Sequence, residues 1–360
     1  RGLGDVYKRQ NQDIIMLASL QDILDTVKSN TLTYQQKLMC LGNIAERLFD
    51  PRELLGYTDE EWQFLQNQMI CDLNEGYAIY RPRYILPDYN VYIKKGCEFL
   101  ELPAPKNLDE ALDGLLILYS HVPSITTFPV YIGRLDVLLD PFITDEEQDY
   151  IKIKCFLNHV DKTVPDSFCH ANIGPYDTKA GRLILKAVIE LEAPTPNMTI
   201  RYDKSKTSRE FAELAAKACL LVSKPSFAND AYYISDLGKQ YGIASCYNAL
   251  PECGGAYTLT RLRLGTIARA CKTVDEMINE LLPRVAKCAL STMDKRHKFV
   301  VEESNFFNTS FLEKEGFIKR TNFTGMFAIV GLADAANHLL QQEGLNETFG
   351  KSQRLSLIHI

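Results

Sequence analysis

Helical patterns alternate with short extended runs through the middle of the chain, and this alternation constrains the fold more than any other feature. Strands that are separated by helices pair in parallel, because each helix returns the chain to the same end of the sheet. We therefore predict an α/β fold. The helical patterns span Leu108–Tyr119, Asp145–Leu157, Arg182–Leu191 and Ser208–Leu221, and the extended runs are Met198–Tyr202 and Tyr241–Ala244.

The N-terminal part of the chain is mainly helical in its pattern. Thr33-x-x-Gln36 matches a capping box and predicts a helix that continues to Leu48. The aromatic, Pro-containing run Ile79–Tyr92 favours an extended segment over a helix. We expect a helical layer over residues 11–107 and the α/β part over residues 108–354. Further helices are expected at Met16–Lys28, Thr58–Leu73, Val274–Phe299 and Met326–Leu340.

Both ends of the chain look like processing scars. Residues 5–10 (DVYKRQ) and 355–360 (LSLIHI) can be encoded by one DNA element read in opposite orientations. That element is similar to the transposase end sequence that is used to fragment DNA for sequencing. We therefore treat residues 1–10 and 355–360 as adapter-like tails, and we expect natural sequence to be missing beyond Arg354.

The composition excludes several classes of protein. The chain is 46% hydrophobic and 24% charged, without an apolar run long enough to cross a bilayer, so no membrane role is expected. The formal net charge of −6 gives no electrostatic basis for binding nucleic acid. Ten Cys at irregular spacings, with no C-x-x-C pair, indicate reduced thiols in a cytoplasm rather than disulfides or a metal site.

Cys246 is the first candidate for chemistry. The run Tyr241–Ala244 before it has the minimum length of a strand. Pro251 and the Gly254-Gly255 pair are expected to end any regular element. Cys246 is therefore predicted to lie on a loop at the end of a strand, where a rigid scaffold directs reactive groups. The alternative is a buried Cys that serves as a small apolar filler.

Three polar segments interrupt the apolar pattern. His121–Tyr131 contains a His, hydroxyls and two prolines, and either lines a pocket or forms a loop whose hydroxyls bind local backbone. Cys169–Thr178 contains an imidazole that could shuttle protons or only anchor a turn. Ser223–Asp230 ends in an Asn-Asp pair, which is also typical of a turn. The short basic runs Arg201–Lys206 and Arg261–Arg263 are expected on a solvated face.

Several of these segments belong to an ordered set: ILPDY at Ile85, HVPSITTFPVYIGRLDVLL at His121, HANIGPYDT at His170, SKPSFAND at Ser223, YGIASCYNALP at Tyr241 and SFLEKEGFI at Ser310. Together they resemble the YjjI-type glycyl radical enzymes of the pyruvate formate-lyase superfamily. The likeness runs from about Leu17 to about Leu345. It implies the ten-stranded β/α barrel of that superfamily, built from two five-stranded parallel half-sheets and incomplete here, with the helical layer at its N-terminal side.

The resemblance also implies a chemistry for Cys246. In such enzymes an S-adenosylmethionine-dependent iron–sulfur activase removes a hydrogen from a backbone glycine, and the glycyl radical then converts a loop Cys into a thiyl radical. Cys246 matches that Cys, and the protein itself would bind no metal or cofactor. A small-molecule substrate, the activase and a second copy of the chain are the implied partners. The candidates for positioning the substrate are His170, Asn172, Asp177, Asn229 and Asn248.

Two features depart from the superfamily pattern. Such enzymes carry the radical glycine near the C-terminus in a motif like R-V-x-G-Y, which this sequence lacks, so the chain is expected to be inactive alone. Dehydratase and decarboxylase relatives have a Glu two residues after the Cys, where Asn248 stands here. Formate-lyase relatives have paired Cys, whereas Ser245 precedes Cys246. An amide cannot accept a proton as a carboxylate does, so neither reaction class transfers.

Two other functions remain open from the sequence. Cys246 could be the nucleophile of an acyl transferase or hydrolase, with His170 as base and Asn172 as the group that orients it. A lowered thiol pKa would favour this function, and a neutral buried thiol would favour the radical. The chain could also be a non-catalytic binding protein that keeps a pocket without a radical.

Overall fold

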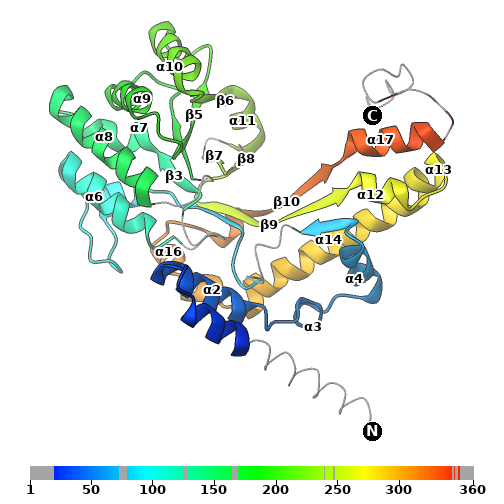
Figure 1. Cartoon of the computed structure of the whole chain (residues 1–360). Coiled ribbons are helices and arrows are strands. Elements are labelled where there is room, and N and C mark those ends of the chain that lie inside the picture. The colour runs from blue at the N-terminus through cyan, green and yellow to red at the C-terminus, as the bar shows by residue number, and fades with distance from the viewer. Residues whose placement is uncertain are drawn as a thin grey trace. The chain divides into compact units, whose positions relative to one another are not determined.

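The computed structural model describes residues 20–72, 79–122, 124, 129–163, 169–238, 240–245, 248–342, 344 and 348 (Figure 1). The chain divides into two compact units whose segments interleave along the sequence. The first unit contains residues 1–79, 260–296 and 327–360, and the second contains residues 80–259 and 297–326. In the described part of the chain, none of the helices has the length and apolar character that crossing a bilayer requires.

Four parallel strands form a sheet in the second unit, as the alternation in the sequence predicts. Neighbouring strands follow the order β3-β4-β5-β6, and all three pairings are parallel. The strands are short, and β4 is buried on both faces. Their bounds are β3 Tyr131–Arg134, β4 His170–Ile173, β5 Asn197–Tyr202 and β6 Ser226–Asn229.

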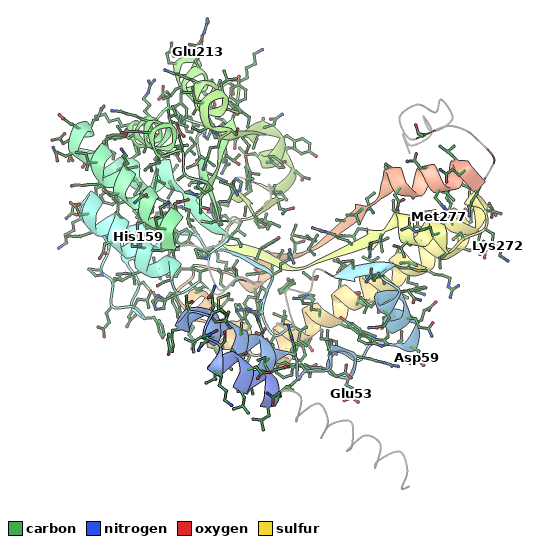
Figure 2. The ribbon with its side chains drawn as sticks, in the orientation of Figure 1. Glu53, Asp59, His159, Glu213, Lys272 and Met277 are labelled. Carbon is green, nitrogen blue, oxygen red and sulfur yellow. The ribbon has the colours of Figure 1, made fainter. Side chains whose placement is uncertain are left out.

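Helices connect these strands and cover the sheet (Figure 1). Asn107, Thr178 and Ser208 begin three of them by accepting a hydrogen bond from a backbone N–H of the first turn. The buried helix faces join the sheet in one apolar cluster, whereas Glu213 and His159 are exposed on the outer faces (Figure 2). The helices are α6 Leu108–Tyr119, α7 Leu135–Leu139, α8 Glu146–Thr163, α9 Lys179–Leu191, α10 Arg209–Val222 and α11 Asp230–Leu237.

Two antiparallel pairings complete the second unit. β2 (Tyr84–Leu86) pairs with the first residues of β9 (Gly254–Arg263). β7 (Tyr241–Ala244) pairs with β8 (Asn248–Pro251) in a hairpin that belongs to neither other sheet. The remaining helices of this unit are α5 Asn90–Lys95, α15 Phe306–Thr309 and α16 Phe311–Lys314.

The first unit is mainly helical. In it, β1 (Ile70–Asp72) pairs antiparallel with the last residues of β9. Ile70, Leu262 and Val285 lie in its buried apolar cluster. Besides residues 20–28, the helices are α2 Tyr34–Glu46, α3 Pro51–Leu55, α4 Asp59–Gln66, α12 Leu264–Arg269, α13 Val274–Glu276, α14 Leu282–Lys298 and α17 Leu332–Gln342, with a π-helical turn at Met277–Leu281. A second π-helical turn, Phe299–Glu303, belongs to the second unit.

Hydrogen bonding and strand pairing explain which of the predicted helices are present. The predicted capping box is present, because Thr33 accepts from the Gln36 N–H and the Gln36 side chain accepts from the Thr33 N–H. The helix predicted from Thr58 ends at Gln66, because residues 70–72 pair with β9 instead. The helix predicted over Met326–Leu340 is also wrong in its first part. β10 (Phe323–Val330) precedes α17, so strand pairing prevailed over helical periodicity.

The Gly254-Gly255 pair does not end a regular element as predicted; it begins β9, the longest strand in the described residues. A Cβ at Gly254 would lie 2.2 Å from the Asn322 carbonyl oxygen, and one at Gly255 would lie 2.0 Å from the Tyr84 carbonyl oxygen. The two glycines therefore allow close approach of the protein's own backbone.

Candidate active site

The hairpin of β7 and β8 carries the predicted reactive position at its tip. Cys246 and residue 247 lie outside the described residues, and their described neighbours are Ser245 and Asn248. Ala244 faces Asn248 across the hairpin. Ser245, the last described residue before Cys246, has no exposed surface and a backbone φ of 55°.

Side chains of the parallel sheet, rather than a neighbouring strand, hold the edge of this hairpin. Successive carbonyl groups of a strand point to opposite edges, so the carbonyls at positions 241 and 243 of β7 share one edge. The carbonyl of Ser245, just after the strand, is bound by a third side chain. We call these three groups the carbonyl row. The three hydrogen bonds join Arg201 Nη1 to Tyr241 O (3.2 Å), Asn172 Nδ2 to Ile243 O (2.9 Å) and His170 Nδ1 to Ser245 O (3.0 Å).

His170, the first residue of β4, is fully buried. Burial lowers its pKa to about 4, because desolvation penalises the imidazolium form. The neutral ring has a single N–H, and a carbonyl oxygen can only accept, so Nδ1 carries the hydrogen that is donated to Ser245 O. Nε2 then accepts from the Thr199 hydroxyl at 2.7 Å, which in turn lies 2.7 Å from Ser226 Oγ. The Ser245 carbonyl therefore fixes the tautomer, and the hydroxyls orient to match it.

Asn172 binds both backbone polar groups of one hairpin residue. Its Nδ2 donates to Ile243 O, and its Oδ1 accepts from the Ile243 N–H at 2.8 Å. The side chain is fully buried. Asn172 therefore replaces, through its amide, the pair of hydrogen bonds that a neighbouring strand would supply.

Arg201 holds the other end of the carbonyl row. Only 2% of it is exposed, which corrects the expectation of a solvated basic run. Its Nε and Nη2 each lie 2.8 Å from Asp230 Oδ1, which also accepts from the Tyr241 hydroxyl at 2.9 Å. The guanidinium lies 3.8 Å from the centre of the Tyr241 ring. A buried Arg is tolerated because a buried carboxylate and an aromatic face compensate its charge.

The other predicted substrate-binding residues lie in different settings. Asp177 accepts from the Ser208 hydroxyl at 2.6 Å and pairs with Arg182, whose hydrogen bond lowers the pKa of the Asp177 carboxyl. Asn229 is exposed and caps α11 by accepting from the Tyr232 N–H. Their contact with substrate stays a prediction. Asn248 is half-buried on β8, opposite Ala244 at the tip of the hairpin.

The sequence contained a signal for the residues that were missed. In β4 and β5, polar and apolar residues alternate, with the polar side chains directed at the hairpin and the apolar ones in the buried cluster. Thr199 and Arg201 share this alternation with His170 and Asn172. Residues 123 and 125–128 of the segment His121–Tyr131 lie outside the described residues, and His121 Nδ1 lies 2.8 Å from Ile117 O.

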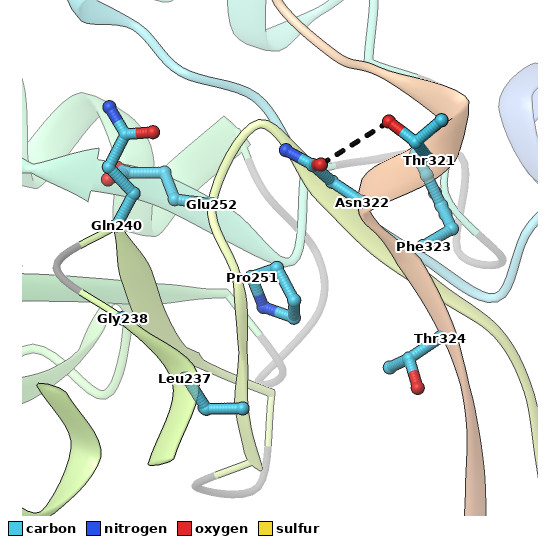
Figure 3. A pocket seen from close by; sticks show the side chains of 9 residues that line it. All are labelled: Leu237, Gly238, Gln240, Pro251, Glu252, Thr321, Asn322, Phe323 and Thr324. Atoms are coloured by element: carbon cyan, nitrogen blue, oxygen red, sulfur yellow. Dashed lines mark hydrogen bonds between the residues drawn. The ribbon is translucent and has the colours of Figure 1, made fainter. Parts of the chain in front are cut away.

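A pocket of about 760 Å³ lies at the opposite end of the hairpin, between Gln240 and Glu252 at its base and the segment Thr321–Thr324 (Figure 3). Glu252 accepts from the Tyr131 hydroxyl at 3.0 Å. Burial, reinforced by the charge of Asp88, raises the pKa of Glu252 to about 7. The extended strand β7 covers roughly 10 Å from Tyr241 to Ala244, so this pocket at the base is distinct from the other end of the hairpin.

No group of three His, Cys, Asp or Glu side chains within the described ranges is arranged to hold a metal ion.

Comparison with known proteins relates the chain to one family. A family model described as glycyl radical enzyme YjjI-like matches residues 32–358. An uncharacterized protein of Haemophilus influenzae is 92% identical over 339 residues, which are 94% of this chain and 66% of that protein. The uncharacterized protein YjjI of Escherichia coli is 44% identical over 328 residues, 90% of this chain and 63% of that protein. The chain thus spans just under two thirds of the length of these relatives.

Solved structures of low sequence identity share the fold. The anaerobic ribonucleotide reductase from Thermotoga maritima, crystallised with citrate in the active site, has a TM-score of 0.68 at 11% identity, covering 94% of this chain and 73% of that one. A structure concerned with 1,2-propanediol dehydration in Roseburia inulinivorans has a TM-score of 0.59 at 10% identity, covering 90% and 60%. The predicted α/β fold is therefore confirmed, and the ten-strand count stays a prediction.

Proposed function

Because the chain belongs to the YjjI-like family of glycyl radical enzymes, we propose that it forms the part of such an enzyme that generates a thiyl radical on Cys246. The radical would abstract a hydrogen atom from a small cytosolic substrate. The observation that carries this proposal is the carbonyl row. Buried donors on β4 and β5 bind the carbonyls of Tyr241, Ile243 and Ser245, and Ser245 directly precedes Cys246.

Hydrogen-atom transfer explains why such a scaffold would be needed. The hydrogen moves only between atoms in close contact, so the sulfur must stay within a narrow range of distances from both donor and acceptor. A hairpin held by Asn172 and His170 places its tip without relying on water. These two donors are neutral at physiological pH, because the pKa of His170 is lowered to about 4 and the Asn172 amide does not titrate. The third donor, Arg201, is paired with the carboxylate of Asp230.

The same contacts disfavour a cysteine nucleophile activated by His170. A general base works best with a pKa near the operating pH, and the pKa of His170 is far below it. Both polar atoms of the Asn172 side chain bind the backbone N–H and C=O of Ile243. Asn172 therefore holds the hairpin backbone and does not orient the imidazole of His170. The geometry thus supports neutral placement of Cys246 over thiolate chemistry.

The proposed radical step is a balanced transfer of one hydrogen atom. The S–H bond of Cys246 breaks, the Cα–H bond of the radical glycine forms, and the unpaired electron moves from carbon to sulfur. We infer that the glycine lies in the part of the full-length relatives that this chain does not span, since a motif like R-V-x-G-Y does not occur here. A radical S-adenosylmethionine activase would install the radical, and a homodimer is the proposed assembly.

The test does not require the substrate. The full-length protein, continued as in its Haemophilus influenzae relative, is activated anaerobically by a radical S-adenosylmethionine activase and observed by electron paramagnetic resonance. Thiol hydrogens exchange with water, so reversible transfer through Cys246 in D₂O replaces the glycine α-hydrogen by deuterium and collapses the hyperfine doublet.

We expect Cys246→Ser to keep the doublet in D₂O, because a hydroxyl O–H bond is too strong to take part. Cys253→Ser is the control: Cys253 is a buried thiol after the end of β8, and burial raises its pKa to about 11. It should behave as wild type. Exchange that persists in Cys246→Ser, or an activase that cleaves S-adenosylmethionine without producing a glycyl radical, would contradict the proposal.

A further inference from the structure

The backbone immediately before Cys246 adopts a conformation that its residue type rarely takes. Ser245 has a φ of 55°, in the left-handed region that side chains with a Cβ usually avoid. Such a conformation persists only where the surroundings determine it. Two contacts do so here, because His170 Nδ1 donates to Ser245 O at 3.0 Å and the Ser245 hydroxyl donates to Tyr84 Oη at 3.1 Å.

Tyr84 is itself rigidly mounted. It lies on β2 with 1% of its surface exposed and faces Ala256 on β9. The absence of a side chain at Gly255 lets β9 approach closely, since a Cβ there would lie 2.0 Å from the Tyr84 carbonyl oxygen. The Arg83 guanidinium lies 4.7 Å from the centre of the Tyr84 ring. Backbone pairing and ring packing therefore fix the position of the phenol oxygen.

We propose that Ser245 and Tyr84 are a positioning pair that sets the direction in which Cys246 leaves the hairpin; this rests on the proposed function. Two anchors on different strands, His170 on β4 and Tyr84 on β2, bind the carbonyl and the hydroxyl of the same residue. With both groups bound, the backbone of Ser245 is held in one conformation, and this conformation sets the direction in which the chain continues after Ser245. Neither residue touches the reacting atoms.

The test measures hydrogen transfer separately from radical installation. The full-length protein is activated as above, and the rate of deuterium incorporation at the glycine is compared among wild type, Ser245→Ala and Tyr84→Phe. Each substitution removes one partner of the hydrogen bond between Ser245 and Tyr84. The sulfur of Cys246 is then held less closely in place, and a displacement by a fraction of an ångström slows hydrogen transfer. We expect each variant to lose roughly tenfold in exchange rate at an unchanged yield of glycyl radical.

Two controls make the result specific. Tyr89→Phe is matched, because Tyr89 is equally buried and its hydroxyl donates to Tyr131 O at 2.9 Å, away from Ser245; its exchange rate should equal that of wild type. The double variant Ser245→Ala with Tyr84→Phe should be no slower than either single variant, since both remove the same bond.

The outcomes separate the two proposals. If Cys246→Ser abolishes exchange while Ser245→Ala and Tyr84→Phe exchange at the wild-type rate, the thiyl function stands and the positioning pair is refuted. Equal slowing by Tyr89→Phe would also overturn the pair, because it would indicate general loosening. If Cys246→Ser still exchanges, the proposed function itself fails. The radical yield reports that each variant folds and is recognised by the activase.

Discussion

Removal of the Asn172 amide is expected to destabilise the fold strongly. In Asn172→Ala, the N–H and the C=O of Ile243 both lose their partners at a fully buried site, where the native bonds are 2.8 and 2.9 Å long. Each buried polar group that is left without a partner costs about 1–3 kcal/mol. The free energy of unfolding should therefore fall by about 2–6 kcal/mol.

Asn229→Ala is the matched comparison for this prediction. The exposed Asn229 makes one capping bond, to the Tyr232 N–H at 3.2 Å, and its loss should cost about 1 kcal/mol. Urea denaturation followed by circular dichroism measures both variants, and hydrogen exchange at the Ile243 amide locates the effect. A loss in Asn172→Ala no larger than in Asn229→Ala, with Ile243 still protected, would refute the role of Asn172 in the carbonyl row.

Three further predictions concern pH and packing. The pKa of Glu252 is raised to about 7 in the fold. Its contribution to the free energy of unfolding is therefore complete below its unfolded pKa near 4.3 and is lost as the pH rises to 7. This loss is about 3 kcal/mol, and it should be absent from the pH dependence of unfolding of Glu252→Gln. The pKa of His170 is lowered to about 4, so its contribution is present above about 6.5 and is lost as the pH falls; His170→Gln should make unfolding less sensitive to acid between pH 6.5 and 4. A Cβ at Gly242 would lie 2.8 Å from the Tyr131 ring, so Gly242→Ala should lower the melting temperature at a cost of about 1–3 kcal/mol, whereas Gly42→Ala, in a helix with open space, should raise it.

The helices around the parallel sheet are predicted well because their signals are local. Of the four strands of that sheet only β5 was predicted, and Tyr241–Ala244, which was expected among the parallel strands, pairs antiparallel with β8. Helix caps such as Ser208 and apolar periodicity depend on residues a few positions apart. Strands β1 and β10 were missed because their pairing with β9 depends on residues far away along the chain. Helical periodicity in a short apolar segment cannot exclude a strand.

In the candidate site, too, the local features were predictable from the sequence and the long-range contacts were not. His170 and Asn172 could be chosen from the sequence because polar residues interrupt an apolar run. Their actual partners, Ser245 and Ile243, are more than 70 positions away, and a sequence gives no measure of that contact. Arg201 was assigned to a solvated face because a charged residue is usually exposed; its compensating partner Asp230 becomes evident only when β5 and β6 pair.

The carbonyl row also limits how the hairpin can change its length. Its three donors bind the backbone carbonyls of Tyr241, Ile243 and Ser245, so they depend on the spacing of alternate residues along the chain. An insertion or deletion of one residue between Tyr241 and Ser245 would move the reactive position by roughly 3.4 Å and turn its side chain to the opposite face. The number of residues between Tyr241 and Ser245 is therefore fixed, and a one-residue insertion or deletion should silence Cys246 even where the protein still folds.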